Sequence, residues 1–133
     1  MDTLLYQDIT YQIRGACFDV WKELAGAFKE KVIENALVIA LEKHGLFIER
    51  QRRIKVKYEE KPVGFYTPDL IVSERVLVEL KCKPFITIAD RRQFWYYMKA
   101  SDYKVGLLIN FGPQKLEIKR VVYDTARRDK KLV

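Results

Sequence analysis

Apolar residues recur every three or four positions along the first third of the chain. The first series contains Leu5, Ile9, Ile13, Cys17, Val20 and Leu24, and the second contains Val32, Ala36, Ile39 and Ala40. This spacing places the apolar side chains on one face of an α-helix. It predicts one helix over 5–24 and a second over 28–44, which ends at Gly45.

The period changes to two after the second helix. Ile54, Val56 and Tyr58 alternate with basic residues, which is typical of a strand with one exposed face. The remaining pattern predicts a turn at 59–62, strands over 63–72, 76–82, 105–111 and 116–123, and a helix over 88–100. The first two of these strands are almost continuously apolar, which favours central positions in a sheet. This order of elements predicts an α/β fold in which helices flank a mixed central β-sheet.

The length of 133 residues fits one domain over 1–133, with residues 124–133 as a flexible basic tail. Hydrophobic residues make up 49% of the chain, yet no apolar run approaches the ~20 residues that cross a bilayer. The first residues lack the basic start and apolar core of a signal peptide. We therefore expect a cytoplasmic protein with no membrane partner.

The formal net charge of +7 changes this picture, because it suits a polyanionic partner such as nucleic acid. A generally solvated basic surface explains the same charge, and composition alone does not separate the two. Much of the excess lies in two segments. The first contains Arg50, Arg52, Arg53, Lys55 and Lys57, and the second contains Arg127, Arg128, Lys130 and Lys131.

Three charged residues interrupt the apolar strands. Side chains alternate along a strand, so Glu79 and Lys81 share one face, and Asp69 on the preceding strand can lie across from them. Burying such charges costs several kcal/mol unless a partner compensates them, and carboxylate oxygens are ligands that Mg²⁺ prefers. An ordinary cross-strand ion pair also explains a Glu-x-Lys sequence. Pro68-Asp69 followed ten residues later by Glu79-Leu80-Lys81 is the more specific pattern.

This pattern, PD-x9-ELK, resembles the signature of the PD-(D/E)xK nuclease superfamily. Over 13–121 the chain also resembles the small GxxExxY family of that superfamily, through ENALVIALEKHGL, KPVGFYTPDLIV, VLVELK and VGLLINFG. The resemblance implies a restriction-endonuclease-like core and a nuclease that depends on Mg²⁺ or Mn²⁺. It implies that Asp69, Glu79 and Glu30 are metal ligands and that Lys81 is the catalytic lysine.

The same resemblance assigns Gln93 and Tyr97 to a Q-x-x-x-Y motif that contacts substrate or supports the lysine. Their four-residue spacing brings both onto one face of the predicted helix. The family motif also departs from its pattern, since Ala27 replaces its glycine and Ile33 its tyrosine. Four successive aromatics, 94–97, must point around the whole helix. At least two therefore belong to the core, and others are available to stack on unpaired bases.

Three hypotheses follow from these residues. The first is a metal-dependent nuclease that hydrolyses phosphodiester bonds, with DNA favoured over RNA. The second is a nucleic-acid-binding or interaction module of the same fold that has lost catalysis, as the changes at Ala27 and Ile33 suggest. The third is a structural protein in which Asp69, Glu79 and Lys81 form only an ion-pair network. The sequence leaves open a homodimer or a larger repair or defence complex.

Overall fold

The computed structural model describes residues 5–24 and 26–123. The basic tail predicted over 124–133 lies outside these residues. The described chain contains three helices and seven strands. In chain order they are α1 (Gln7–Leu24), α2 (Glu30–Lys43), β1 (Ile48–Arg50), β2 (Ile54–Tyr58), β3 (Lys61–Tyr66), β4 (Leu70–Val72), β5 (Val76–Lys81), α3 (Ile88–Ser101), β6 (Val105–Phe111) and β7 (Leu116–Val122).

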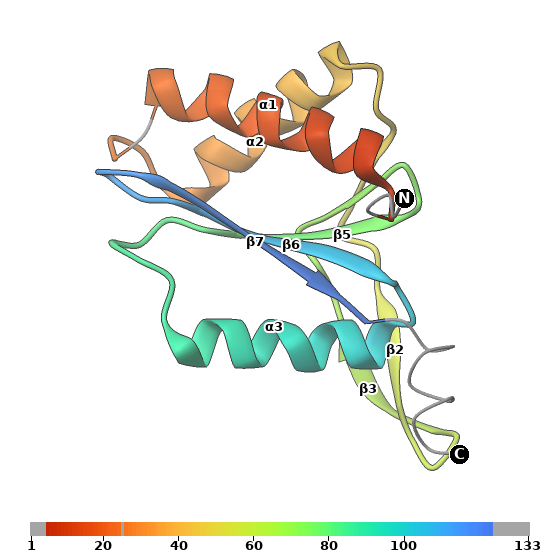
Figure 1. Ribbon diagram of the computed structural model, residues 1–133. Helices are drawn as coiled ribbons and strands as arrows, with labels where there is room; N and C mark the ends of the chain where they lie inside the picture. The colour runs from red at the N-terminus through yellow and green to blue at the C-terminus, as the bar shows by residue number, and fades with distance from the viewer. Residues whose placement is uncertain (1–4, 25, 124–133) are drawn as a thin grey trace.

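A five-stranded mixed sheet forms the centre of the molecule, in the order β1-β4-β5-β6-β7. β5 pairs with β6 in parallel, and every other neighbouring pair in this sheet is antiparallel. Helices α1 and α2 cover one face and α3 covers the other, as Figure 1 shows. The predicted fold class, with helices on a mixed sheet and almost continuously apolar strands at its centre, is confirmed.

The two faces of the sheet carry separate apolar cores. Alternate residues of the central strands pack against α1 and α2, as Val78 and Leu80 do. Leu77 and Leu108 project to the opposite side, where they meet Phe94 and Met98 of α3. Because β5 alternates in this way, Glu79 lies on the same side as Leu77, facing α3.

The approach of α3 to the sheet depends on Gly106 of β6. A Cβ atom at this position would clash with the sulfur of Met98 and lie 2.7 Å from Cζ of Phe94. The absence of a side chain at Gly106 therefore lets α3 pack close to the strands. This packing determines how near the residues of α3 come to those of β5.

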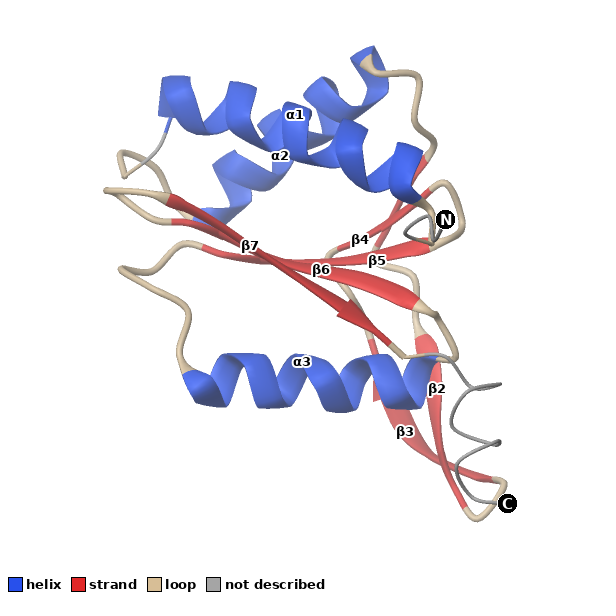
Figure 2. Cartoon of the chain, in the orientation of Figure 1, coloured by secondary structure: helices blue, strands red, loops and turns tan. Residues whose placement is uncertain are grey.

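The strand predicted over 63–72 is wrong as a single element. It consists of two strands that belong to different sheets, because β3 pairs with β2 in a two-stranded ribbon and β4 joins the main sheet. Thr67-Pro68-Asp69 separates them, and Pro68 has no N–H to continue a ladder. The short strand β1 was not predicted. The ribbon leaves the sheet beside one end of α3 (Figure 2).

Within the described residues, no helix is long and apolar enough to cross a membrane.

Candidate active site

Two backbone hydrogen bonds hold Asp69, just before β4, beside Glu79 of β5 at the open end of the β4–β5 hairpin. The backbone N–H of Asp69 donates to Oε1 of Glu79 over 3.1 Å, and the N–H of Leu80 donates to Oδ2 of Asp69 over 2.8 Å. These backbone bonds use one oxygen of each carboxylate. The hairpin register therefore fixes both carboxylates side by side, as the sequence predicted.

The surroundings of Glu79 and Asp69 raise the pKa of both carboxyl groups. Burial first, and the nearby charge of Asp69 second, raise the pKa of Glu79 to about 7. Burial also raises the pKa of Asp69, although the hydrogen bond from Leu80 opposes the rise. Partly buried carboxylates with raised pKa values carry negative charge that their surroundings do not fully compensate, and a cation would relieve it.

Lys81 lies close enough to this pair to lower the pKa of Glu79, after larger effects from burial and Asp69. It nevertheless makes no hydrogen bond or salt bridge with any residue that the structure describes. The ion-pair network that the structural hypothesis requires is therefore not formed at Lys81.

Glu30 reaches the site from α2, although α2 covers the opposite face of the sheet. Burial and then the charge of Asp69 raise the pKa of Glu30, whereas Lys81 lowers it. This burial is partial, because the residue as a whole is exposed, and Glu30 forms no salt bridge within the described residues. The structure thus brings Glu30 near Asp69 and Lys81.

Tyr97 and Tyr66 bring α3 and the ribbon to the carboxylates. Their rings stack with centroids 3.9 Å apart and an interplanar angle of 21°. The Tyr66 hydroxyl is buried without a hydrogen bond of good geometry. Burial and then the neighbouring Glu79 charge raise the pKa of this tyrosine. Tyr97 therefore lies beside the site, while Gln93, one turn earlier on α3, is exposed.

We compared the sequence and the structure of this chain with those of known proteins. The model of the PD-(D/E)XK nuclease superfamily matches residues 7–121. The chain belongs to the PD-(D/E)XK nuclease superfamily. No curated protein matches the sequence.

Two solved structures resemble this superfamily member over most of its length. One is an alkaline exonuclease, LHK-Exo, from Laribacter hongkongensis, with 11% identity, a TM-score of 0.45, and coverage of 97% of this chain and 76% of that one. The other is the structure of SSO0001, with 12% identity, a TM-score of 0.45, and coverage of 93% and 81%.

The donor set of this PD-(D/E)XK chain fits a hard divalent cation. Within the part of the chain that the structure describes, no group of three His, Cys, Asp or Glu side chains is gathered as a complete metal site. Mg²⁺, however, is commonly held by one or two carboxylates and keeps several waters and substrate oxygens. Asp69 and Glu79 provide such a pair, and Glu30 is a third carboxylate nearby.

A second glutamate on α2, Glu34, was not predicted. It is only 4% exposed, and its Oε2 accepts hydrogen bonds from Nε and Nη2 of Arg50 at 3.1 and 2.6 Å. Its charge also contributes to the raised pKa of Asp69, after burial and the opposing Leu80 hydrogen bond. The signal in the sequence was the four-residue spacing from Glu30, which places both on one helical face.

Ile33 stands where the GxxExxY pattern has tyrosine, and the structure gives this change a packing role. Its side chain is 1% exposed and belongs to the apolar core under α1 and α2. Ala27, by contrast, is exposed before α2 begins. The replacement at position 33 thus contributes to the core, where a hydroxyl would need a partner.

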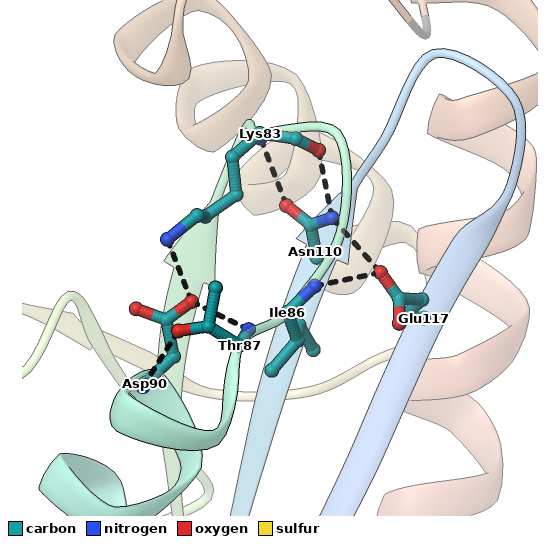
Figure 3. Close-up of polar contacts among 6 residues, drawn as sticks. All are labelled: Lys83, Ile86, Thr87, Asp90, Asn110 and Glu117. Atoms are coloured by element: carbon teal, nitrogen blue, oxygen red, sulfur yellow. Dashed lines mark hydrogen bonds and ion pairs between the residues drawn. The ribbon is translucent and has the colours of Figure 1, made fainter.

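Asn110 braces the loop that follows Lys81 (Figure 3). Its Oδ1 accepts from the N–H of Lys83 over 3.0 Å, and its Nδ2 donates to the carbonyl of Lys83 over 2.8 Å. The same amide donates to Glu117, which also accepts from the N–H of Ile86. Asn110 is fully buried and was missed, although a polar residue within the apolar strand VGLLINF was a signal.

The same loop ends in a capping box that starts α3. Thr87 and Asp90 each accept a hydrogen bond from the other's backbone N–H, and Lys83 forms a 2.7 Å salt bridge with Asp90. Burial alone would raise the pKa of Asp90, but these partners hold it at about 2. The segment between the catalytic lysine candidate and α3 is therefore fixed at both ends.

Proposed function

We propose that this chain is a nuclease that hydrolyses nucleic-acid phosphodiester bonds with the help of Mg²⁺ or Mn²⁺, and that DNA is its preferred substrate. Membership of the PD-(D/E)XK superfamily supports the reaction class. The observation that carries the assignment is the anchored Asp69–Glu79 pair beside a lysine that has no salt-bridge partner among the described residues. The resemblance to GxxExxY proteins supports the same function.

Each residue has a chemical role in this proposal. Asp69 and Glu79, with Glu30, would hold the cation, which when bound supplies Lewis-acid stabilisation of negative charge on the phosphate. Lys81 orients the attacking water and stabilises the charge that develops on phosphorus oxygens. Tyr97 stacks beside the pair, and Gln93 extends its helical face toward the substrate strand.

The decisive experiment is metal-dependent cleavage of labelled DNA by the wild type and by Lys81→Ala. We expect the variant to lose ~100-fold or more in kcat, because its positioned charge acts mainly in the transition state. Lys104→Ala, which removes an exposed lysine without a salt bridge to any described residue, is the matched control and should retain activity. Equal cleavage by wild type and Lys81→Ala, purified identically, would refute the assignment.

A binding module without catalysis is the second candidate, and the burial of Ile33 favours it. That residue replaces the hydroxyl of the family motif with core packing. This candidate predicts salt-sensitive binding of nucleic acid and no cleavage in Mg²⁺ or Mn²⁺. Cleavage that requires Lys81 excludes it.

A further inference from the structure

The ribbon of β2 and β3, which we call the arm, has two chemically different faces. Its inner face carries Ile54, Val56 and Tyr66, which pack against the core beneath α3. Its outer face is exposed and follows the alternate residues of β2. That face presents Arg53, Lys55, Lys57 and Phe65.

The charges on the outer face are not neutralised by the protein. Arg53, Lys55 and Lys57 form no salt bridge with any residue that the structure describes. Alternation along β2 spaces Lys55 and Lys57 roughly 7 Å apart. That spacing is close to the distance between successive phosphates of an extended single strand. Arg53 directly precedes the strand, and the pairing with β3 shifts register between Val56 and Lys57. Of the basic segment noted in the sequence, Arg50 and Arg52 pair with Glu34 and Glu49, and the other three form a row of cations without a salt bridge among the described residues.

Phe65 adds an aromatic surface to this row. It lies directly opposite Lys55 in the ribbon register and is 54% exposed. The guanidinium of Arg53 lies 3.8 Å from the centroid of its ring. Arg53 thus lies over one face of the ring, and the exposed remainder is the surface available to a base. Stacking for a base and positive charge for the backbone are the two contacts that single-stranded nucleic acid uses.

The arm also leads to the candidate active site. Tyr66 follows Phe65 on β3 and stacks on Tyr97, and only Thr67 and Pro68 separate Tyr66 from Asp69. A strand lying along the outer face is thereby directed to the end of β3 where the carboxylates begin. Figure 1 shows the arm extending from this point past the end of α3.

We propose that the outer face of the arm binds a single-stranded stretch of the nucleic-acid substrate. Its phosphates contact Arg53, Lys55 and Lys57, and an unpaired base stacks at Phe65. This inference rests on the proposed function for the identity of the ligand. It adds a preference for unpaired strands, because bases within a duplex do not offer their faces to Phe65.

The test measures binding of fluorescein-labelled oligothymidylate of about 20 nucleotides by anisotropy, in EDTA and over a range of NaCl concentrations. Lys55→Gln/Lys57→Gln should reduce the slope of log K against log salt by about 1.4, since each phosphate contact to a single strand contributes about 0.7. The control Lys43→Gln/Lys104→Gln removes the same charge elsewhere and should leave the slope within about 0.3 of the wild type.

The aromatic contact is tested by a separate pair of variants. Phe65→Leu should weaken binding roughly 5- to 150-fold with little change in the salt slope, whereas Phe65→Tyr retains stacking and should bind like the wild type. Unchanged melting temperatures establish that both variants fold. Binding of a duplex as tight as that of the single strand, or equal competition by polyglutamate, would overturn the proposal.

The two proposals fail in different ways. If the wild type binds the single strand through the arm but cleaves nothing, the inference stands and the nuclease assignment falls. If cleavage requires Lys81 while the arm variants bind and cleave like the wild type, the arm proposal alone is wrong. No binding of the single strand at low salt also overturns the arm proposal, whatever the cleavage assay gives.

Discussion

Glu30 and Glu34 lie one turn apart on α2, but their surroundings give them different roles. Glu34 is buried and accepts two hydrogen bonds from Arg50, so its charge is used within the protein. Glu30 is exposed and has no salt-bridge partner in the described residues, while Asp69 helps to raise its pKa after burial. Glu34 therefore acts as a structural residue, and the role of Glu30 as a metal ligand stays a prediction.

This difference predicts opposite effects of two matched variants. Glu34→Gln should lower the free energy of unfolding by about 1–3 kcal/mol, because Arg50 loses a charged partner at a partly buried position. Glu30→Gln should leave it unchanged or slightly higher, because a carboxylate with a raised pKa is destabilising when ionised. Urea denaturation at pH 7 measures both, and equal losses would contradict the assignment of roles.

The sequence was sufficient to predict that Asp69, Glu79 and Lys81 lie together, because charges stand out within apolar strands, but their roles as metal ligands and catalytic lysine stay predictions. Asn110 gave a similar signal that was missed, whereas the contacts that define Glu34, Tyr66 and Asn110 are not visible in the sequence. Each owes its role to a partner that the chain brings near only on folding, such as Arg50, Glu79 or the Lys83 backbone. The roles of Gln93 and Tyr97 in catalysis stay predictions, although Tyr97 does lie beside the pair.

At the scale of elements, the connection from β5 to α3 positions the site. Asn110 of β6 bonds both backbone groups of Lys83, and Glu117 of β7 holds the N–H of Ile86. Two neighbouring strands thus constrain a loop that begins one residue after Lys81. Because this loop is held by β6 and β7, the sheet determines where α3 begins.

Loss of this brace should be costly. Asn110→Ala leaves the N–H and carbonyl of Lys83 without their partners, so the free energy of unfolding should fall by about 2–4 kcal/mol. Gln114→Ala, in the exposed turn between β6 and β7, should change it by less than about 0.5 kcal/mol. Chemical denaturation compares the two. A loss for Asn110→Ala no larger than that of the control would show that the network contributes little.

Helices and strands were predicted well where a regular apolar pattern ran over many residues. They were predicted poorly where the position depended on which strand was the pairing partner. The three helices and strands β5, β6 and β7 follow from their apolar patterns. The split of 63–72 does not, because an apolar run does not specify which sheet it joins. Pro68 was the local sign of a break, and the preceding ribbon supplied the alternative partner.

At the scale of the whole molecule, the net charge is positive, whereas the candidate site contains a pair of carboxylates. The chain has a net charge of +7, yet Glu79 and Asp69 both have raised pKa values because burial acts on each of them first. Lys81 lowers the pKa of both carboxylates and Lys31 that of Asp69, but burial has the larger effect on each. Ionisation of Asp69 and Glu79 therefore destabilises the folded protein, and a cation bound between them would offset this effect.

This arrangement predicts a fall in stability as pH rises. Below pH 4.5, the ordinary pKa of Glu79, both folded and unfolded states are protonated there; above about 7, both are ionised. Between these values the folded state holds the extra proton, so the free energy of unfolding should decrease across this window by about 1–3 kcal/mol in EDTA.

Two controls assign the effect to Glu79. Glu79→Gln should flatten the decrease, whereas Glu23→Gln, an exposed change on α1, should not. Mn²⁺ should raise the melting temperature of the wild type more at pH 8 than at pH 5.5, since the ligand must be deprotonated. A Glu79→Gln protein with the full pH dependence would refute the explanation.

At the tip of the arm, the backbone conformation is one that its residue types disfavour. Glu59 and Glu60, between β2 and β3, adopt φ values of 50° and 66°, a left-handed conformation that favours asparagine and glycine. Packing of the inner face beneath α3 holds the ribbon in place against that local preference. The tip is therefore locally frustrated. Tertiary contacts of the arm, rather than the preferences of the turn residues, must keep it folded.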